Sequence, residues 1–599
     1  MKPSITLRQP TPATEHRALL FICSLSIALG IIGGFVAPAL MRLIGFVTNL
    51  SFYGRISSDF SSPAANHLGA WVIVVPAIGG IIVGLMARFG SRAIRGHGIP
   101  EAMEQVLEGN SRIPARVTIL KPVSAAFAIG TGGPFGAEGP IIATGGALGS
   151  LIGQVLSTTG AERKTLLAAG AAAGMAATFG SPVSATLLAV ELLLFEFRAR
   201  SLIPVALASA AAAGIRIKIM GAGAIFSMPD FAPVSLNALA LYAIIGIVIG
   251  LAAVVVTRIV YWLEDMFEHL PIHWMWWPAI GGLVVGVVGY FAPRTLGVGY
   301  DNIADILSNK FSLHLIGFLC LMKFVSWSIA LSSGTSGGTL APLFTIGSGA
   351  GSVLGVFLLW IFPLSGLDVR VAALVGMAAI FAGASRALLA SIVFAFETTH
   401  QTNGLLPLLA GSTLAYLVAR MCMQNSIMTE KIARRGLRIP EDYDADVFVQ
   451  TTVGSVMDKE VKVLPPDMPV SELADRIAHH DPAISIHDAW PLVNSDRQLT
   501  GIVTRNDVIR SLEKIGATDL KLSDAGNSAL VTVFPDETVH EAVARMLNHG
   551  VGRLLVVSRD DPKQMVGYVS RTHLLSSRFR QVQNEQVRED GWIKKRSIK

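Results

Sequence analysis

One glycine-rich stretch, Gly130 to Gly153, lies in apolar sequence and carries a single charged residue. It reads GTGGPFGAEGPIIATGGALGSLIG, and the charged residue is Glu138. An ionisable group inside a membrane segment is costly, so it is a candidate functional residue. Glycines allow the backbone to leave the helix, and Pro140 suits the first turn of a new one. We therefore predict a broken helix that restarts near Glu138, with free N–H groups at the membrane midplane that can bind an anion.

The stretch has a second copy in the same chain. Residues 121–153 match residues 323–355, 202 positions later, and with a slightly larger offset Glu191 matches Glu397. Two Gly/Pro-interrupted segments at corresponding places in two halves indicate the binding site of a transporter. The identical pairs are Lys121/Lys323, Val123/Val325, Ser124/Ser326, Gly132/Gly334, Gly136/Gly338, Pro140/Pro342, Gly145/Gly347, Gly149/Gly351 and Gly153/Gly355.

The alternative is that these glycines only let helices pack closely. We expect that role for Gly145, Gly149 and Gly153, which recur every four residues. Packing alone does not explain why GAEGP and GTLAP stand at matching positions. The binding-site interpretation is therefore preferred.

The composition indicates a membrane protein with a soluble C-terminal part. Hydrophobic residues make up 52% and charged residues 15% of the 599 residues. The net charge of +6 comes largely from short loops and tails, as in cytoplasmic flanks of membrane helices, and does not indicate nucleic-acid binding. The three cysteines form no spaced cluster, so neither a disulfide framework nor a metal site is expected. We expect a multi-pass protein of the plasma or bacterial inner membrane with both termini cytoplasmic.

The chain divides into six parts. The soluble part contains one pattern twice: a short extended start, a Pro-Asp turn, an amphipathic helix, two strands joined by a polar turn, and a helix. The predicted parts are a cytoplasmic tail (1–16), a transmembrane domain (17–437, with halves at about 17–222 and 237–430), an acidic linker (438–452), two soluble modules (453–514 and 522–580) and a polar, disordered tail (581–599).

The motifs GHGIP, GAEGP and GTLAP, in this order and each beginning a helix, resemble the anion-site signatures of the CLC chloride channel and transporter family. The soluble modules resemble a pair of cystathionine-β-synthase (CBS) domains. The resemblance implies an α-helical polytopic fold of two inverted repeats with tilted and broken helices, followed by α/β tandem CBS domains. It also implies a homodimer with one pore per subunit, chloride or another small inorganic anion as the transported ligand, and no required cofactor.

The resemblance carries over to particular residues. Glu138 corresponds to the gating glutamate, which as a carboxylate occupies the outer anion position. The alternative without a functional role is that a lysine such as Lys121 neutralises the charge of Glu138. The remaining residues of the implied anion site are His97, Gly98, Ala137, Gly139, Thr339, Leu340 and Met428.

Three of these residues depart from the family pattern. His97 replaces a serine, Leu340 replaces a phenylalanine, and Met428 falls near the tyrosine that closes the inner side. Both familiar side-chain hydroxyls are thus missing. His97 either donates an N–H to the anion or binds a loop carbonyl, and its ring is expected to titrate near neutral pH, its cationic form strengthening anion binding.

One position bears on the transport mechanism. Exchangers of this family usually carry a proton-relay glutamate directly after the structural glutamate that Glu191 matches, and here the relay position is Leu192. A leucine cannot carry a proton. The sequence therefore favours channel-like anion conduction, with a proton-coupled chloride antiporter as the alternative.

Two other activities were considered from the sequence. GTSGG fits a serine-nucleophile motif centred on Ser336, but the only histidine in a later membrane segment is His400, so an intramembrane protease is a remote alternative and no enzyme activity is expected. The resemblance to CBS pairs implies an adenine-nucleotide site in which Asp507 holds the ribose and Thr504 lies near the phosphates, whereas the second copy has Ser570 and His573 at these positions. The alternative is that the modules only brace the dimer.

Overall fold

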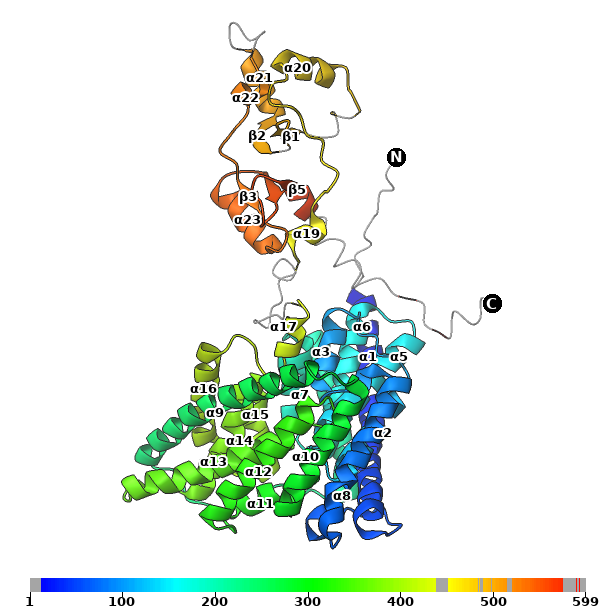
Figure 1. Cartoon of the computed structure of the whole chain (residues 1–599), viewed down its shortest axis with the longest axis vertical. Helices are drawn as coiled ribbons and strands as arrows, with labels where there is room; N and C mark the ends of the chain where they lie inside the picture. Colours follow the sequence, from blue (N-terminus) through cyan, green and yellow to red (C-terminus); the bar gives the residue numbers. More distant parts are fainter. Residues whose placement is uncertain are drawn as a thin grey trace. The chain divides into compact units, whose positions relative to one another are not determined.

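The computed structural model describes residues 12–437, residues 451–574 apart from 483, 485–487, 497 and 514–519, and the tail residues 589 and 592. The chain forms two compact units, one of residues 1–439 with 588–599 and one of residues 440–587 (Figure 1). The predicted N-terminal tail up to residue 11 and most of the predicted linker lie outside the described residues, as does the predicted tail except for residues 589 and 592.

The first unit is helical. Its first half contains α1 (Pro12–Thr48), α2 (Val75–Phe89), α3 (Ile99–Leu107), α4 (Val117–Gly130), α5 (Glu138–Val155), α6 (Gly160–Phe179), α7 (Pro182–Ala189) and α8 (Ala199–Met220). Its second half contains α9 (Leu236–Glu268), α10 (Trp277–Phe291), α11 (Tyr300–Leu307), α12 (Leu313–Ser332), α13 (Leu340–Ile361), α14 (Val369–Ser385), α15 (Leu388–Thr399) and α16 (Leu405–Cys422), and the short helix α17 (Glu430–Arg434) follows.

The two halves repeat the same packing. In the first half α5 packs on α6, and α1 packs on α6 and α8; in the second, α13 packs on α14, and α9 packs on α14 and α16. The halves meet where α2 packs on α10 and α7 on α15. Each helix of the first half thus has its counterpart eight helices later, as the sequence repeat predicts.

The relation between the halves is an inversion. Gly136 and Gly338 are equivalent residues of the repeat, and they pair in antiparallel direction, with Gly338 N–H donating to Gly136 O at 2.9 Å. Equivalent strands of backbone can run antiparallel only if one half is turned over. The structure thus has the predicted fold, two inverted repeats of broken helices.

Small residues allow the closest helix contacts. A Cβ added at Gly145 would lie 2.1 Å from Gly170 O, and one at Gly149 would lie 2.0 Å from Leu166 O. These glycines hold α5 against α6 without side chains between them, so their predicted packing role is confirmed.

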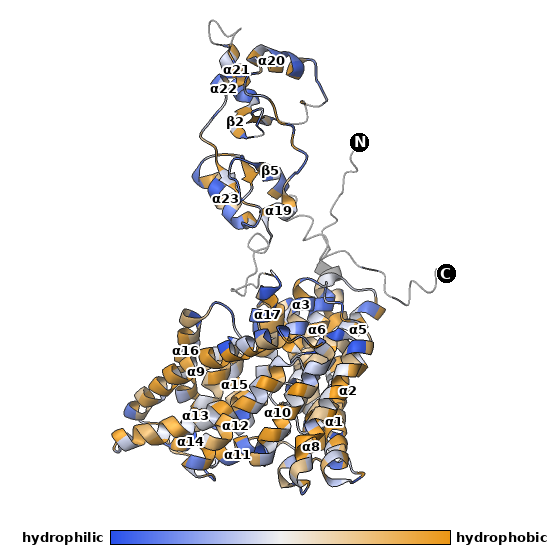
Figure 2. Cartoon of the chain, viewed as in Figure 1, coloured by the Kyte–Doolittle hydropathy of each residue, from blue (hydrophilic) through white to orange (hydrophobic). Residues whose placement is uncertain are grey.

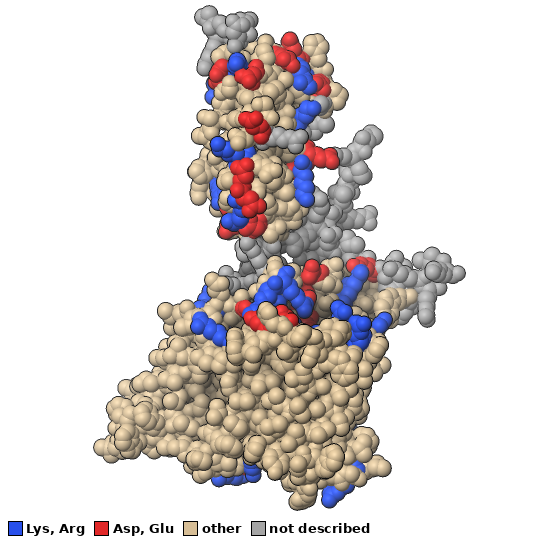
Figure 3. All heavy atoms as spheres, in the orientation of Figure 1, with Lys and Arg blue, Asp and Glu red and all other residues tan. Residues whose placement is uncertain are grey.

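Apolar residues cover the middle of this unit. Orange residues dominate its helices in Figure 2, and on the face shown in Figure 3 charged side chains gather at its two ends, most of them at the end that carries α17. Eight helices of the described part are long and apolar enough to cross a membrane. One of them is α8, with 22 residues.

The second unit contains two small α/β modules. The first holds α20 (Val470–Ala478), the antiparallel pair β1 (Ala489–Val493) and β2 (Leu499–Thr504), and α21 (Arg505–Leu512). The second holds α23 (Val539–Asn548) and a sheet in which β4 (Arg553–Val557) pairs parallel with β3 (Thr532–Val533) and antiparallel with β5 (Met565–Ser570).

The starting segments of the two modules are exchanged. Val453 of α19 (Val453–Val456) lies in the core of the second module, and Thr452 pairs with Thr538. Conversely, Leu522 of α22 (Leu522–Ala525) lies in the core of the first module. The sequence repeat places each start with its own copy, so this exchange was not predicted.

Candidate anion site

Four helices of the membrane unit begin at comparable turns of the repeat. They are α3, α5, α11 and α13, whose first residues are Ile99, Glu138, Tyr300 and Leu340. The starts of α3 and α5 near GHGIP and GAEGP, and of α13 within GTLAP, agree with the sequence prediction. The first N–H groups of a helix have no partner inside it and carry partial positive charge, so such starts attract anions.

The loops that precede these helices are bonded to one another. Gly136 and Gly338 pair across the two halves, and Gly96 N–H donates to Thr335 O at 3.2 Å. A Cβ on Gly139 would lie 2.2 Å from His97 O and 2.9 Å from the Cα of Gly338. The starts of α3, α5 and α13 thus converge, and only glycine permits this approach.

Glu138 lies at this convergence and is fully buried. Its Oε1 accepts a hydrogen bond from Ala341 N–H, in the first turn of α13, at 2.5 Å. Its Oε2 accepts one from the Tyr300 hydroxyl at 3.1 Å. The carboxylate therefore occupies a position where helix α13 and a phenol offer donors to a negative charge.

Tyr300 was missed in the sequence. It is the first residue of α11 and packs against the rings of Phe179 and Phe226. The signal was present: Gly297 and Gly299 stand 201 residues after Gly96 and Gly98, and all four have positive φ. Extending the repeat upstream would have given GVGYD as a fourth signature.

Lys121 is bonded elsewhere than to Glu138. Its Nζ donates to Ile94 O and Gly96 O, both at 2.8 Å, and the equivalent Lys323 donates to Thr295 O at 2.9 Å and Gly297 O at 3.1 Å. Each lysine thus fixes the loop before α3 or α11. This geometry speaks against the alternative that Lys121 neutralises Glu138.

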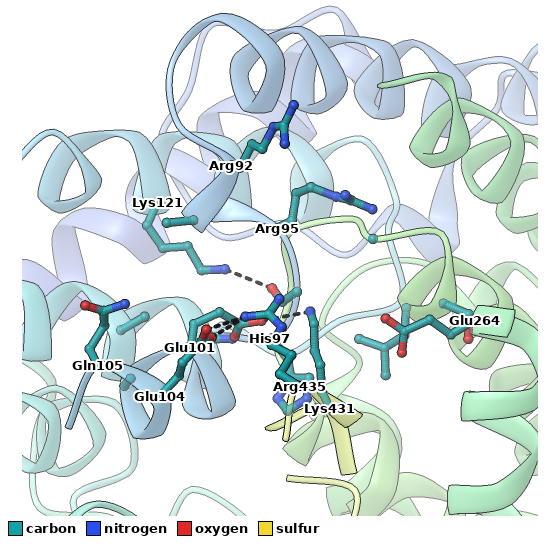
Figure 4. A pocket seen from close by; sticks show the side chains of 18 of the residues that line it. Arg92, Arg95, His97, Glu101, Glu104, Gln105, Lys121, Glu264, Lys431 and Arg435 are labelled. Carbon is teal, nitrogen blue, oxygen red and sulfur yellow. Dashed lines mark hydrogen bonds and ion pairs between the residues drawn. The ribbon is translucent and has the colours of Figure 1, made fainter. Parts of the chain in front are cut away.

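A cavity of about 530 Å³ is lined both by residues at and after α17 and by the loop that precedes α3 (Figure 4). Its walls include His97, Gly98, Lys121 and Ala143 beside the anion loops, and Lys431 of α17. Lys431 pairs with Glu101 at 3.2 Å. The cavity is therefore an approach, wide enough for water and small ions, to one side of the convergent helix starts.

His97 lies in the loop before α3, outside the membrane-spanning helices, and is 6% exposed. Its Nδ1 is buried, and within the described part of the chain it has no hydrogen-bond partner. Burial lowers the pKa of His97 to about 4, although Glu101 opposes this shift. The ring is thus neutral near pH 7, and the expectation that it titrates there was wrong.

The other predicted anion-site residues differ in what they offer. Gly98 N–H donates to Glu101 Oε2 at 2.8 Å, so this N–H is already engaged. The buried Thr339 hydroxyl, in contrast, has no hydrogen-bond partner among the residues described. Met428 is fully buried in the loop after α16, and its neighbour Ile427 lines the cavity.

The comparisons with known proteins agree with this geometry. A family model described as voltage gated chloride channel matches residues 78–420. The chain belongs to the voltage-gated chloride channel (CLC) family. A CBS domain model matches residues 453–514 and 522–579.

Relatives of this CLC protein are named either as chloride channels or as proton/chloride exchange transporters. Chloride channel protein CLC-f of Arabidopsis thaliana is 27% identical over 564 residues, which cover 82% of this chain and 71% of the relative. The H(+)/Cl(−) exchange transporter ClcA of Klebsiella pneumoniae subsp. pneumoniae is 29% identical over 439 residues, which cover 70% of this chain and 90% of the relative.

Solved structures share the fold. A slow cyanobacterial Cl−/H+ antiporter has a TM-score of 0.63 at 24% identity, covering 69% of this chain and 97% of that structure. A eukaryotic CLC transporter has a TM-score of 0.59 at 20% identity, covering 93% of this chain and 98% of that structure.

Two glutamates of this CLC chain cap helices across the inverted halves. Glu191 accepts hydrogen bonds from Leu389 N–H and Ala390 N–H, both at 2.9 Å, at the start of α15. The equivalent Glu397 accepts them from Val183 and Ser184 at the start of α7. The predicted structural role of Glu191 is confirmed. Leu192 follows it in a buried π-helical turn.

Ser336 does not have the surroundings of a nucleophile. Its hydroxyl accepts a hydrogen bond from the Ser124 hydroxyl at 3.1 Å. Both residues are fully buried, Ser124 within α4 and Ser336 in the loop before α13 of the CLC fold. The contact gives Ser336 a structural partner and not a general base.

Thr504 and Asp507 bond to each other at the start of α21. Asp507 Oδ2 accepts from the Thr504 hydroxyl at 2.6 Å and from Thr504 N–H at 2.9 Å, while Asp507 N–H donates back to the Thr504 hydroxyl. Thr538 and Glu541 form the same reciprocal cap on α23. In this CLC chain the pair thus has a helix-capping role, with which any ribose contact must compete.

Proposed function

We propose that the protein passes chloride or a similar small anion across the membrane through a pore gated by Glu138. The observation that carries this proposal is the hydrogen bond from Ala341 N–H to the Glu138 carboxylate. A carboxylate held by the N-terminus of α13 stands where a free anion would bind, and the two compete for the same donors. The site residues proposed beside it are His97, Gly98, Ala137, Gly139, Thr339, Leu340 and Met428.

In this gate the Glu138 carboxylate leaves the anion position so that a chloride ion can occupy it. Protonation of Glu138, or rotation of its side chain, withdraws the tethered charge from the helix starts. Backbone dipoles carry only partial charge, so they bind a dehydrated anion without holding it as tightly as a fixed cation would. The cavity beside His97 supplies the anion from the α17 end, which we place in the cytoplasm because basic residues gather there.

Conduction in this proposal is channel-like. Leu192 stands at the relay position, packed in the interior, and it has no proton to give. The second candidate is a proton-coupled chloride antiporter, as several relatives are named. Glu264 favours it, because this half-buried carboxylate of α9 lines the same cavity as His97 (Figure 4).

The deciding experiment uses purified protein in proteoliposomes. An imposed chloride gradient is expected to drive chloride efflux without uphill proton movement. Glu138→Gln is expected to speed efflux and to flatten its dependence on pH between pH 4.5 and 7.5. Glu191→Gln is the matched control, because it also removes a buried carboxylate from a helix start but lies at the α15 cap.

Two results would contradict the proposal. Proton movement at a fixed ratio to chloride would establish the antiporter, and its loss in Glu264→Gln would identify the inner proton acceptor. Wild-type efflux and pH response in Glu138→Gln would remove the gate assignment.

Further parts of the proposal concern assembly and regulation. We propose a homodimer with one pore per subunit in the plasma or bacterial inner membrane, and an adenine nucleotide bound by the CBS pair beside Thr504 and Asp507. The family membership and the CBS match support these points, and the mutual bonding of Thr504 and Asp507 limits the second.

A further inference from the structure

A buried arginine lies at the other end of the helices that form the anion site. Arg163 of α6 has a side chain that is only 2% exposed. Its guanidinium donates to Asn110 O at 3.1 Å and Gly153 O at 3.4 Å. Carbonyl groups alone do not neutralise a buried cation, which is costly without a counter-charge.

The counter-charge comes from the C-terminal tail. Glu589 Oε2 accepts a hydrogen bond from Arg163 Nη2 at 2.7 Å and also pairs with Arg112. Its backbone N–H donates to Thr158 O at 3.1 Å. A tail residue more than 400 positions away is thus bound through both its side chain and its backbone.

Two of the residues that bind Glu589 lie just after α3 and α5 in the chain. Arg112 lies in the segment between α3 and α4, and Thr158 in the turn between α5 and α6. Within this region the Ser150 hydroxyl donates to Ser111 O at 2.6 Å and accepts from Ile113 N–H at 2.8 Å. Glu589 therefore joins the segment after α3 to the turn after α5 and to the first turns of α6, and the N-termini of α3 and α5 converge near His97 and Glu138.

We propose that Arg112, Arg163 and the Thr158 carbonyl form a socket for an acidic peptide, that its occupant is the chain's own tail through Glu589, and that docking restrains α3 and α5 and so modulates anion flux. Two arginines and one backbone acceptor suit a glutamate in a peptide. Glu589 is 38% exposed, so the contact is sensitive to salt and reversible.

Hydrogen–deuterium exchange of the full-length protein tests the docking. Glu589→Gln is expected to raise the exchange rate of the peptide covering 157–163, which contains both Thr158 and Arg163, at least about fivefold, and 0.5 M NaCl to do the same in the wild type. Asp590→Asn, which removes the same charge from the next residue, is the matched control and should match the wild type. Unchanged exchange in Glu589→Gln, or an equal rise in Asp590→Asn, would overturn the socket.

Chloride efflux from proteoliposomes tests the coupling. Glu589→Gln is expected to change the efflux rate at least about twofold relative to both the wild type and Asp590→Asn. Released tails with unchanged efflux would overturn the restraint on α3 and α5. Only this arm depends on the proposed function, so the exchange result stands if the chain proves not to conduct chloride.

Discussion

At the scale of single residues, three side chains set the chemistry of the site, and they differ in how readily the sequence alone identifies them. Glu138 was visible in the sequence because it is a lone charge in apolar surroundings. His97 was visible as a position, but its protonation state was not, because its burial depends on distant parts of the fold. Tyr300 escaped notice because its helix start lacks the proline that marks the other three.

The Tyr300 hydroxyl donates a hydrogen bond to the Glu138 carboxylate, and in the proposed gating this bond stabilises the closed state. Tyr300→Phe removes one donor to a charged acceptor, a contribution of about 1.5 kcal/mol or more, which corresponds to roughly tenfold in occupancy. We expect faster chloride efflux at a given pH, measured in proteoliposomes. Tyr242→Phe is the control, because its hydroxyl bonds the backbone of Asp368 instead; an equal acceleration there would argue against a specific role.

His97 acts as a neutral group. A pKa of about 4, depressed by burial, means that the cationic form is populated only below about pH 4. His97→Ser should therefore change the relative efflux of chloride and other halides by the same factor at pH 6 and pH 8. A change confined to pH 6 would show that the cation matters after all. His314→Ser, at an exposed position of α12, is the comparison variant.

At the scale of elements, helix starts and loop contacts have different origins in the sequence. The starts of α3, α5 and α13 were predictable because glycine and proline act locally. The pairing of Gly136 with Gly338 was not, because it joins loops that only the inverted packing brings together. The exchanged starts of the CBS modules were missed for the same reason. Each starting segment directly precedes one module in the sequence but packs in the core of the other module.

Gly338 tests the loop contact. An added Cβ would lie 2.6 Å from Gly136 O and 3.0 Å from Gly139 N, and neither backbone atom can move without displacing the start of α5. Gly338→Ala should lower both chloride efflux, by at least about tenfold, and the melting temperature. At Gly317 of α12 an added Cβ meets nothing within 4 Å, so Gly317→Ala should keep efflux and gain up to about 1 kcal/mol in helix stability. Normal efflux in Gly338→Ala would show that the loops tolerate separation.

At the scale of the whole molecule, the chain joins a membrane unit that has the CLC fold to a CBS pair with its own hydrophobic cores. Composition alone separated these parts. Composition could not show which contacts the residues of each motif make. Asp507 illustrates this, because the resemblance to CBS pairs implies a ribose contact, whereas in the structure its carboxylate bonds to Thr504, the N-cap of its own helix.

Nucleotide binding by the CBS pair can be separated from capping. ATP, ADP or AMP at 100 times its dissociation constant should stabilise the full chain by about 2.7 kcal/mol, measured as a rise in melting temperature. Asp507→Ala should abolish this rise and also lose the cap, whereas Glu541→Ala should lose only the equivalent cap on α23. If no nucleotide at millimolar concentration raises the melting temperature, the remaining role of the modules is to brace the dimer.

The inverted repeat described above matches in backbone but not in side chains. Gly98 and Gly299 both have positive φ, yet the residues beside them are His97 against Val298 and Ile99 against Tyr300, and Leu340 stands opposite Glu138 in the repeat. Along the proposed pore, an anion arriving from one side would meet an imidazole first, and one arriving from the other would meet a phenol and a carboxylate. A scaffold that is symmetric in shape and asymmetric in chemistry should rectify: at equal and opposite voltages, inward and outward currents should differ in size, and the ratio should fall toward one in Glu138→Gln.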